Sequence, residues 1–237
     1  MKRTIISAAL CAALFSIAAN AQKKGTGRLF PETWGGEKSL AVKSECTIAE
    51  GDFNKDGFKD VAVIAVPRNP ALMRTREDGY EYNFNKPVLA VFFGQKKGKP
   101  KLHKEYRDTI PGNDAEDEDC FHENQLTVND EGDLCITVGE FYAAGSADSP
   151  RVEYVFRWQN GGFFLIGKNY GSFSRYSGEA KNVSENYLTH KMRTVTSNVF
   201  DEDVPEEETW IDLPDVPLQK LGSEQLTVSE PEIEAVG

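Results

Sequence analysis

Residues 51–66, GDFNKDGFKDVAVIAV, contain the most informative pattern in the chain. An acidic turn leads here directly into an apolar segment. Ca²⁺ binds about six to eight oxygen ligands on a curved backbone, with a glycine at the sixth loop position for the sharp bend. Gly57 stands at that position. The spacing predicts one Ca²⁺ site, with oxygens at alternate loop positions from Asp52, Asn54, Asp56, the backbone carbonyl of Phe58, and Asp60.

This turn differs from an EF-hand loop in the residues on its C-terminal side. An EF-hand loop requires a bidentate glutamate at its twelfth position and then a helix. Val63 stands at that position here, inside the β-branched run of residues 61–66. Such a run favours a strand, so we expect Asp60 to be the last side-chain ligand before a buried strand.

The pattern D-x-N-x-D-G-x-x-D followed by a strand resembles the calcium loops of FG-GAP and VCBS repeats, which occur in integrin-like β-propellers. One copy of the pattern is present, and a second apolar segment at residues 87–94 ends in Phe-Phe-Gly, which strengthens the resemblance. The resemblance implies that Ca²⁺ pins one strand of a sheet to the next. The matching positions are Asp52, Asn54, Asp56, Phe58 through its carbonyl, and Asp60.

Two questions about the acidic segments stay open at the level of sequence. Asp, Asn and Gly also form ordinary turns, so the loop at residues 52–60 is either a calcium loop or an unmetallated acidic turn. Residues 113–119, NDAEDED, carry five carboxylates and are either a solvated loop or a second cation site. A catalytic use of the 52–60 carboxylates is disfavoured, because no other motif converges on them.

The first residues have the pattern of a secretory signal peptide at 1–21. Lys2 and Arg3 form a positive start, residues 5–17 are apolar, and Ala19-Asn20-Ala21 is a small-x-small cleavage site. The apolar run is too short for a membrane span. We therefore expect export to the periplasm, the cell surface or the extracellular space, with a flexible lead-in at residues 22–38.

The charge balance excludes some partner classes. The formal net charge is −11, and removal of Lys2 and Arg3 with the signal peptide makes it two units more negative. A chain this acidic is a poor candidate for binding nucleic acid or an anionic membrane, and it attracts cations. The hydrophobic content of 39% suits a folded globular protein.

Cysteine usage is compatible with an exported protein without fixing its crosslinks. Cys46, Cys120 and Cys135 remain after signal removal, so at most one intrachain disulfide forms. Neither Cys46–Cys120 nor Cys120–Cys135 is supported by spacing, and buried free thiols are an equal alternative. No C-x-x-C is present and the three histidines are scattered, so the pattern does not indicate a zinc site.

Strand signals dominate the chain. The apolar segments at 61–66 and 87–94 are near-continuous, which predicts paired strands buried on both faces. Apolar positions alternate from residue 125 onward, and Asn160-Gly161 is the strongest hairpin signal. We predict an all-β fold of mostly antiparallel short strands, arranged as a meander, a sandwich or a partial β-propeller-like sheet.

The predicted domain organisation rests on these signals. One β domain is expected at residues 39–213, with an acidic loop–strand unit at 50–106 and a meander at 125–197. Residues 214–237 lack periodicity and end in an acidic stretch, so a disordered acidic tail is expected there. Residues 156–194 are similar to the C-terminal part of a group of exported bacterial proteins of unknown function, and the likeness extends over residues 50–197.

These observations favour an exported, calcium-stabilised, β-rich protein with a binding or structural role toward a protein or glycan. The nucleophile motif G-x-S-x-G is absent, so a non-enzymatic role is favoured. The first alternative is a hydrolase that acts on glycans or peptides. The second is a binder of small ligands or glycans with an aromatic face, although alternating aromatics on strands are more often core residues.

Overall fold

The computed structural model describes residues 46–118, 120–142, 148–201 and 203–231. The predicted signal peptide, the lead-in at 22–38 and the start of the predicted β domain lie outside these residues. Within them the structure is all-β and antiparallel, as predicted, with one 3₁₀ turn, η4 (Pro70–Leu72). No helix in the described part of the chain is long and apolar enough to cross a membrane.

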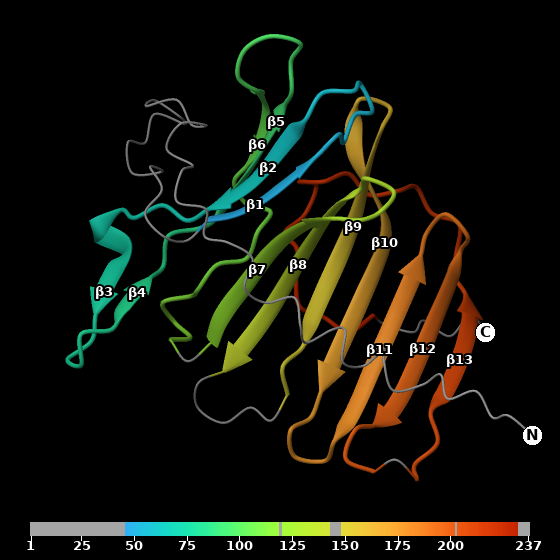
Figure 1. Cartoon of the computed structure of the whole chain (residues 1–237). Coiled ribbons are helices and arrows are strands. Elements are labelled where there is room, and N and C mark those ends of the chain that lie inside the picture. The colour runs from blue at the N-terminus through green and yellow to red at the C-terminus, as the bar shows by residue number, and fades with distance from the viewer. Residues whose placement is uncertain (1–45, 119, 143–147, 202, 232–237) are drawn as a thin grey trace, which may run out of the picture.

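The larger sheet is a meander of seven antiparallel strands, in which strands that follow one another in sequence are paired (Figure 1). The predicted hairpin at Asn160-Gly161 is confirmed: both residues have positive φ angles, 50° and 74°, as a tight two-residue turn requires. The seven strands are β7 (Cys120–Val128), β8 (Leu134–Tyr142), β9 (Arg151–Gln159), β10 (Gly162–Phe173), β11 (Glu179–Asn186), β12 (Lys191–Asn198) and β13 (Glu207–Asp212).

The smaller sheet has four antiparallel strands in the order β1-β2-β5-β6. The prediction that the two apolar segments pair in the middle of a sheet is confirmed, because β2 pairs with β5 and both are buried on both faces. Side chains alternate along each strand, so Ile64 and Leu89 join the main core while Val63 and Ala90 form a second cluster. The four strands are β1 (Cys46–Gly51), β2 (Asp60–Ala65), β5 (Val88–Phe93) and β6 (Lys101–Tyr106).

A short hairpin, β3 (Met73–Thr75) and β4 (Glu81–Asn83), follows β2 and precedes β5 in the sequence. It extends away from both sheets (Figure 1). Its aromatic side chains stack on one another and on the large sheet. The ring of Tyr82 lies 5.8 Å from that of Phe84 and 5.9 Å from that of Phe121 on β7. The hairpin is therefore anchored to the start of β7.

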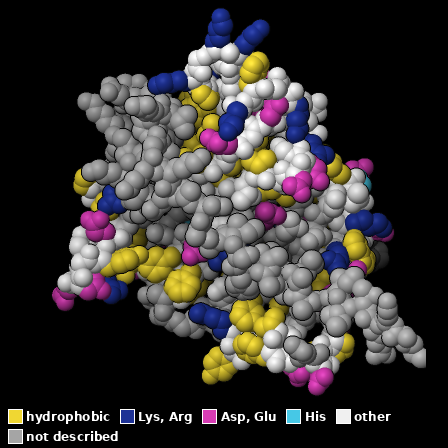
Figure 2. All heavy atoms as spheres, viewed as in Figure 1, with side chains coloured by type: hydrophobic (Ala, Val, Ile, Leu, Met, Phe, Trp, Pro, Cys, Tyr) yellow, Lys and Arg dark blue, Asp and Glu magenta, His cyan; other side chains and the backbone are white. Residues whose placement is uncertain are grey.

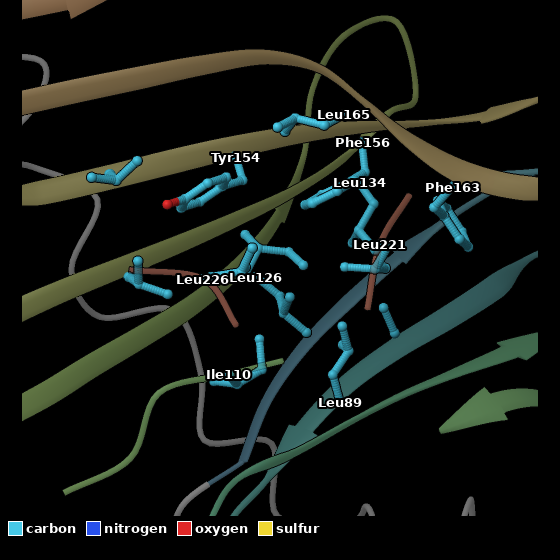
Figure 3. Close-up of a cluster of buried hydrophobic side chains, with 14 of the residues drawn as sticks. Leu89, Ile110, Leu126, Leu134, Tyr154, Phe156, Phe163, Leu165, Leu221 and Leu226 are labelled. Carbon is cyan, nitrogen blue, oxygen red and sulfur yellow. The ribbon is translucent and has the colours of Figure 1, made fainter. Parts of the chain in front are cut away.

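The main core lies between the two sheets. Figure 3 shows Leu89 of the small sheet facing Leu134 and Phe156 of the large sheet, with Leu221 between them. Phe53, from the loop before β2, packs edge-on against Phe163 of β10 with ring centroids 5.9 Å apart. The β1–β2 connection thus contributes directly to the core that joins the sheets.

The expectation of a disordered tail from residue 214 is wrong for residues 219–231. Leu221 and Leu226 are only 4% and 7% exposed. Backbone hydrogen bonds join the segment to β10 on one side, where the Leu165 N–H donates to the Gln219 carbonyl at 2.8 Å. On the other side the Leu226 N–H donates to the Thr109 carbonyl at 2.8 Å. Two leucines spaced five residues apart match neither the strand period nor the helix period, so the sequence pattern did not predict this packing.

Candidate functional site

The acidic loop connects β1 to β2, and its two ends are paired, since Gly51 lies opposite Asp60 in the strand register. Lys55 and Gly57 have positive φ angles of 60° and 84°. These left-handed conformations curl the loop tightly, and glycine adopts one without steric cost. The sequence prediction that Gly57 makes the sharp bend is therefore confirmed.

The curled backbone turns its N–H groups toward the side chains of the loop. Asp52 accepts hydrogen bonds from the N–H of Asp56 at 3.0 Å and from that of Gly57 at 2.9 Å. Asn54 Oδ1 accepts from the same Asp56 N–H at 3.1 Å, and Asp56 Oδ1 accepts from the Phe58 N–H at 2.9 Å. Each of these oxygens has two lone pairs, so each retains acceptor capacity for a cation.

Asp60 occupies a different place from the other predicted ligands. It is fully buried, and its Oδ2 accepts from the N–H of Phe53 at 2.8 Å and of Asn54 at 3.4 Å. Its Oδ1 accepts from the Gly94 N–H at 2.8 Å. This carboxylate therefore ties both ends of the loop to the end of β5. Burial raises the pKa of Asp60, with a smaller contribution from the Asp56 charge, while the three amide hydrogen bonds oppose the rise.

Gly94 also belongs to this site, because its N–H donates to Asp60. In the sequence this residue is noted only as the end of the Phe-Phe-Gly pattern. A Cβ atom at Gly94 would stand 2.5 Å from the Lys59 carbonyl oxygen and 2.8 Å from Phe58 Cβ. Real Cβ atoms do not approach backbone so closely, so only glycine lets the end of β5 reach Asp60. The sequence signal was the glycine directly after an apolar strand.

The loop also contacts the large sheet. Lys55 Nζ donates to the Glu131 carbonyl in the β7–β8 turn at 2.6 Å. That turn is itself held by Asp133, which is 4% exposed and accepts two hydrogen bonds from Arg157 of β9, at 3.0 and 2.7 Å. The acidic loop therefore lies where β1, β2, β5 and the β7–β8 turn meet.

The donor set of the loop fits a hard cation in part. Asp52, Asn54 and Asp56 bring three oxygen-bearing side chains to one tight turn, and oxygens are the ligands that Ca²⁺ takes. Asp60 is already engaged by three amides and anchors the loop. A second group of possible metal ligands in the described part of the chain lies outside the loop, on β7 and β8. It consists of Cys120, His122 and Glu140, whose ligand atoms lie within 4.8 Å of one another.

Four aromatic side chains of the large sheet are core residues. Tyr154, Phe156, Phe163 and Tyr170 are all buried, so these four rings do not form an exposed binding face. A cavity of about 250 Å³ lies between the large sheet and residues 219–229. Lys168 lines it beside Tyr154, whose ring centroid is 5.7 Å from the Lys168 ammonium, and burial lowers the pKa of that lysine.

Comparison with family models, with curated proteins and with solved structures finds no match for this chain. The face seen in Figure 2 carries lysine and arginine side chains interspersed with aspartate and glutamate on its described part.

Proposed function

We propose that this chain is an exported, calcium-stabilised β protein whose role is binding or structural, and that Ca²⁺ binds in the acidic loop. The proposed ligands are Asp52, Asn54, Asp56, the Phe58 carbonyl and Asp60. The single observation that carries the proposal is the position of the loop, which joins β1, β2 and β5 and contacts the β7–β8 turn through Lys55. A cation held there would fix the two sheets relative to each other.

Electrostatics supports a cation at this position. The loop gathers the carboxylates of Asp52, Asp56 and Asp60 within nine residues, and a divalent cation between them would offset the repulsion of like charges. Burial raises the pKa of Asp60, so its ionised form at neutral pH carries a cost that a nearby divalent cation would offset. The resemblance to FG-GAP and VCBS loops points the same way, and calcium modules of exported proteins often bind at about 10⁻⁴–10⁻³ M.

Small-molecule binding is the second candidate, and the cavity beneath residues 219–229 favours it. Its volume is about 250 Å³, and Lys168 offers a partly desolvated cation toward an anionic or polar ligand. Ligand pockets are commonly about 300–1,000 Å³, so this cavity would accept only a small group. The hydrolase alternative requires two carboxylates facing each other across a cleft and stays a prediction.

The decisive experiment compares thermal unfolding of residues 22–237 in EDTA and in millimolar Ca²⁺. At a Ca²⁺ concentration about 100 times the dissociation constant, binding stabilises the folded state by roughly 2.7 kcal/mol. For a domain of this size the unfolding midpoint then rises by roughly 5–10 °C. The Asp52→Asn, Asp56→Asn double variant keeps the side-chain shape and removes two charges, and its midpoint should not respond to Ca²⁺.

The matched control is Asp201→Asn, Asp203→Asn, which makes the same charge change at exposed positions. This control should keep the full response to Ca²⁺. Equal midpoints with EDTA and with Ca²⁺ in the wild type would reduce the loop to an acidic turn. A response that survives in the loop variant would place the cation elsewhere.

A further inference from the structure

Three metal-ligating side chains meet at one end of the β7–β8 pair. In this antiparallel register Cys120 lies opposite Tyr142, and His122 lies opposite Glu140. Alternate residues of a strand, and their direct cross-strand partners, point to the same face. Cys120, His122 and Glu140 therefore share a face, and one ligand atom from each lies within 4.8 Å of the other two.

Further along β7, the side chains on this face belong to the hydrophobic core. Leu126, four residues beyond His122 on the same strand, belongs to the main hydrophobic cluster. Cys120 is 7% exposed and carries a free thiol. The three side chains thus sit at the edge of a packed interior, where a polar group without a partner is costly.

His122 supplies an independent sign of a missing partner. Its Nδ1 atom is shut off from solvent and has no hydrogen-bond partner among the described residues. Buried polar atoms are nearly always paired, and an exception calls for a ligand, an ion or a water. The charged groups that act on this ring are the carboxylates of Glu140, Asp114 and Asp117, so the surroundings attract a cation. A neutral imidazole nitrogen is a common metal ligand.

We propose that Cys120, His122 and Glu140 bind one borderline-soft divalent cation, with Zn²⁺ as the best fit. A thiolate, an imidazole and a carboxylate are all ligands of tetrahedral Zn²⁺, at about 2.0–2.3 Å. Such ligands lie roughly 3.3–3.8 Å from one another, so side-chain adjustments of about 1 Å complete the site. Binding converts the Cys120 thiol to a thiolate and releases its proton to solvent. Three protein ligands leave the fourth position for water.

A catalytic cysteine is the rival interpretation of the same three residues, and the surroundings oppose it. Nucleophilic cysteines are partly exposed and have lowered pKa values. Cys120 is buried, and burial together with the Glu140 and Asp117 charges raises its pKa, against a smaller lowering by the Tyr142 hydroxyl. A metal ion would supply the positive charge that the thiolate lacks here.

The sequence did not indicate a zinc site, because the ligand spacing is that of strands and not of a C-x-x-C loop. Cys120 and His122 are two residues apart, as strand alternation requires for a shared face. Glu140 is 18 residues further on, and only the register of the β7–β8 pair brings it to His122. The sequence feature that could have indicated the site is the C-x-H pattern at the start of β7.

The test uses Co²⁺ as a spectroscopic substitute for Zn²⁺, on residues 22–237 under mild reducing conditions. The wild type should show a near-ultraviolet thiolate-to-Co²⁺ charge-transfer band and d–d absorption of tetrahedral intensity, both abolished by one equivalent of Zn²⁺. Cys120→Ser should lose the charge-transfer band. His122→Gln and Glu140→Gln each remove a proposed ligand, so they should weaken Zn²⁺ affinity, measured by competition, by at least the roughly 10–100-fold that loss of an outer-shell partner costs.

Three control variants make the outcome specific. Cys135→Ala removes the other described thiol, which lies on the opposite face of β8, and His103→Gln removes a histidine on β6. Both should keep the spectrum, as should Asp52→Asn, Asp56→Asn, which separates this site from the acidic loop. Circular dichroism of each variant confirms folding. A Co²⁺ spectrum without a thiolate band, or Zn²⁺ affinity unchanged in a folded His122→Gln variant, would overturn the proposal.

Discussion

Gly94 shows how a single residue determines the geometry of the candidate calcium loop. Its N–H donates to Asp60, and its missing side chain leaves room for the Lys59 carbonyl. Gly94→Ala should destabilise the fold by about 1–3 kcal/mol, the usual cost of overpacking, and should weaken any Ca²⁺ response with it. Urea denaturation measures the change. Gly162→Ala is the control, because its Cβ would meet nothing closer than 3.6 Å, and an equal loss there would refute this account of Gly94.

His103 gives the protein a pH dependence near neutrality. Its ring stacks on Phe93 with centroids 4.4 Å apart and meets Trp158 edge-on at 5.1 Å. The side chain is exposed at its outer edge, and partial desolvation by these rings, with the nearby Lys104 charge, lowers the pKa of His103 below its usual 6.5, against an opposing effect of Asp60. The folded state therefore resists protonation, while the unfolded chain takes up the proton as the pH falls below about 6.5.

The free energy of unfolding should consequently carry the full His103 contribution above pH 6.5 and lose it as the pH falls below 6.5 through the lowered folded-state pKa. Chemical denaturation of the wild type and of His103→Gln across this range measures the difference in slope. The variant should be less stable throughout, since it loses the stacked ring, but with a flatter slope. Parallel curves for the two proteins would show that this histidine is not the titrating group.

At the scale of elements, residues 219–231 act as a strap that closes the core. Deleting residues 219–237 removes Leu221 and Leu226 and the backbone bonds to Leu165 and Thr109. Burial of two leucines is worth about 4–6 kcal/mol, a large part of the stability of a typical domain. Urea denaturation should therefore show a severely destabilised or unfolded chain. Deleting residues 232–237 alone spares these contacts and should change little, and a stable 1–218 chain would contradict the packing.

The sequence predicted strands correctly where a local pattern of residue types was clear. The run at residues 61–66 and the Asn160-Gly161 turn identified β2 and the β9–β10 hairpin, because β-branched repeats and left-handed turn residues have local causes. The strap at residues 219–231 and the Cys120–His122–Glu140 cluster depend on contacts between distant segments. Register and long-range packing have no local signature, so these features appeared only in the folded structure.

At the scale of the whole molecule, two antiparallel sheets share one core, and the acidic loop sits at their junction. The sequence predicted the all-β class and the loop, but not that the loop would touch the β7–β8 turn through Lys55. The two proposed cation sites occupy different parts of the fold, one on the β1–β2 connection and one at the end of the β7–β8 pair. We propose that Ca²⁺ in the acidic loop stabilises the junction of the two sheets.

Isothermal titration of residues 22–237 with Ca²⁺, after removal of bound metal, decides whether the acidic loop binds this ion. The wild type should bind one Ca²⁺ per chain, with a dissociation constant within about 10⁻⁵–10⁻³ M. Asp52→Asn, Asp56→Asn should bind none, and Cys120→Ser should bind Ca²⁺ as the wild type does. Absence of Ca²⁺ binding in the wild type, or unchanged binding in the loop variant, would show that the acidic loop is not a calcium site.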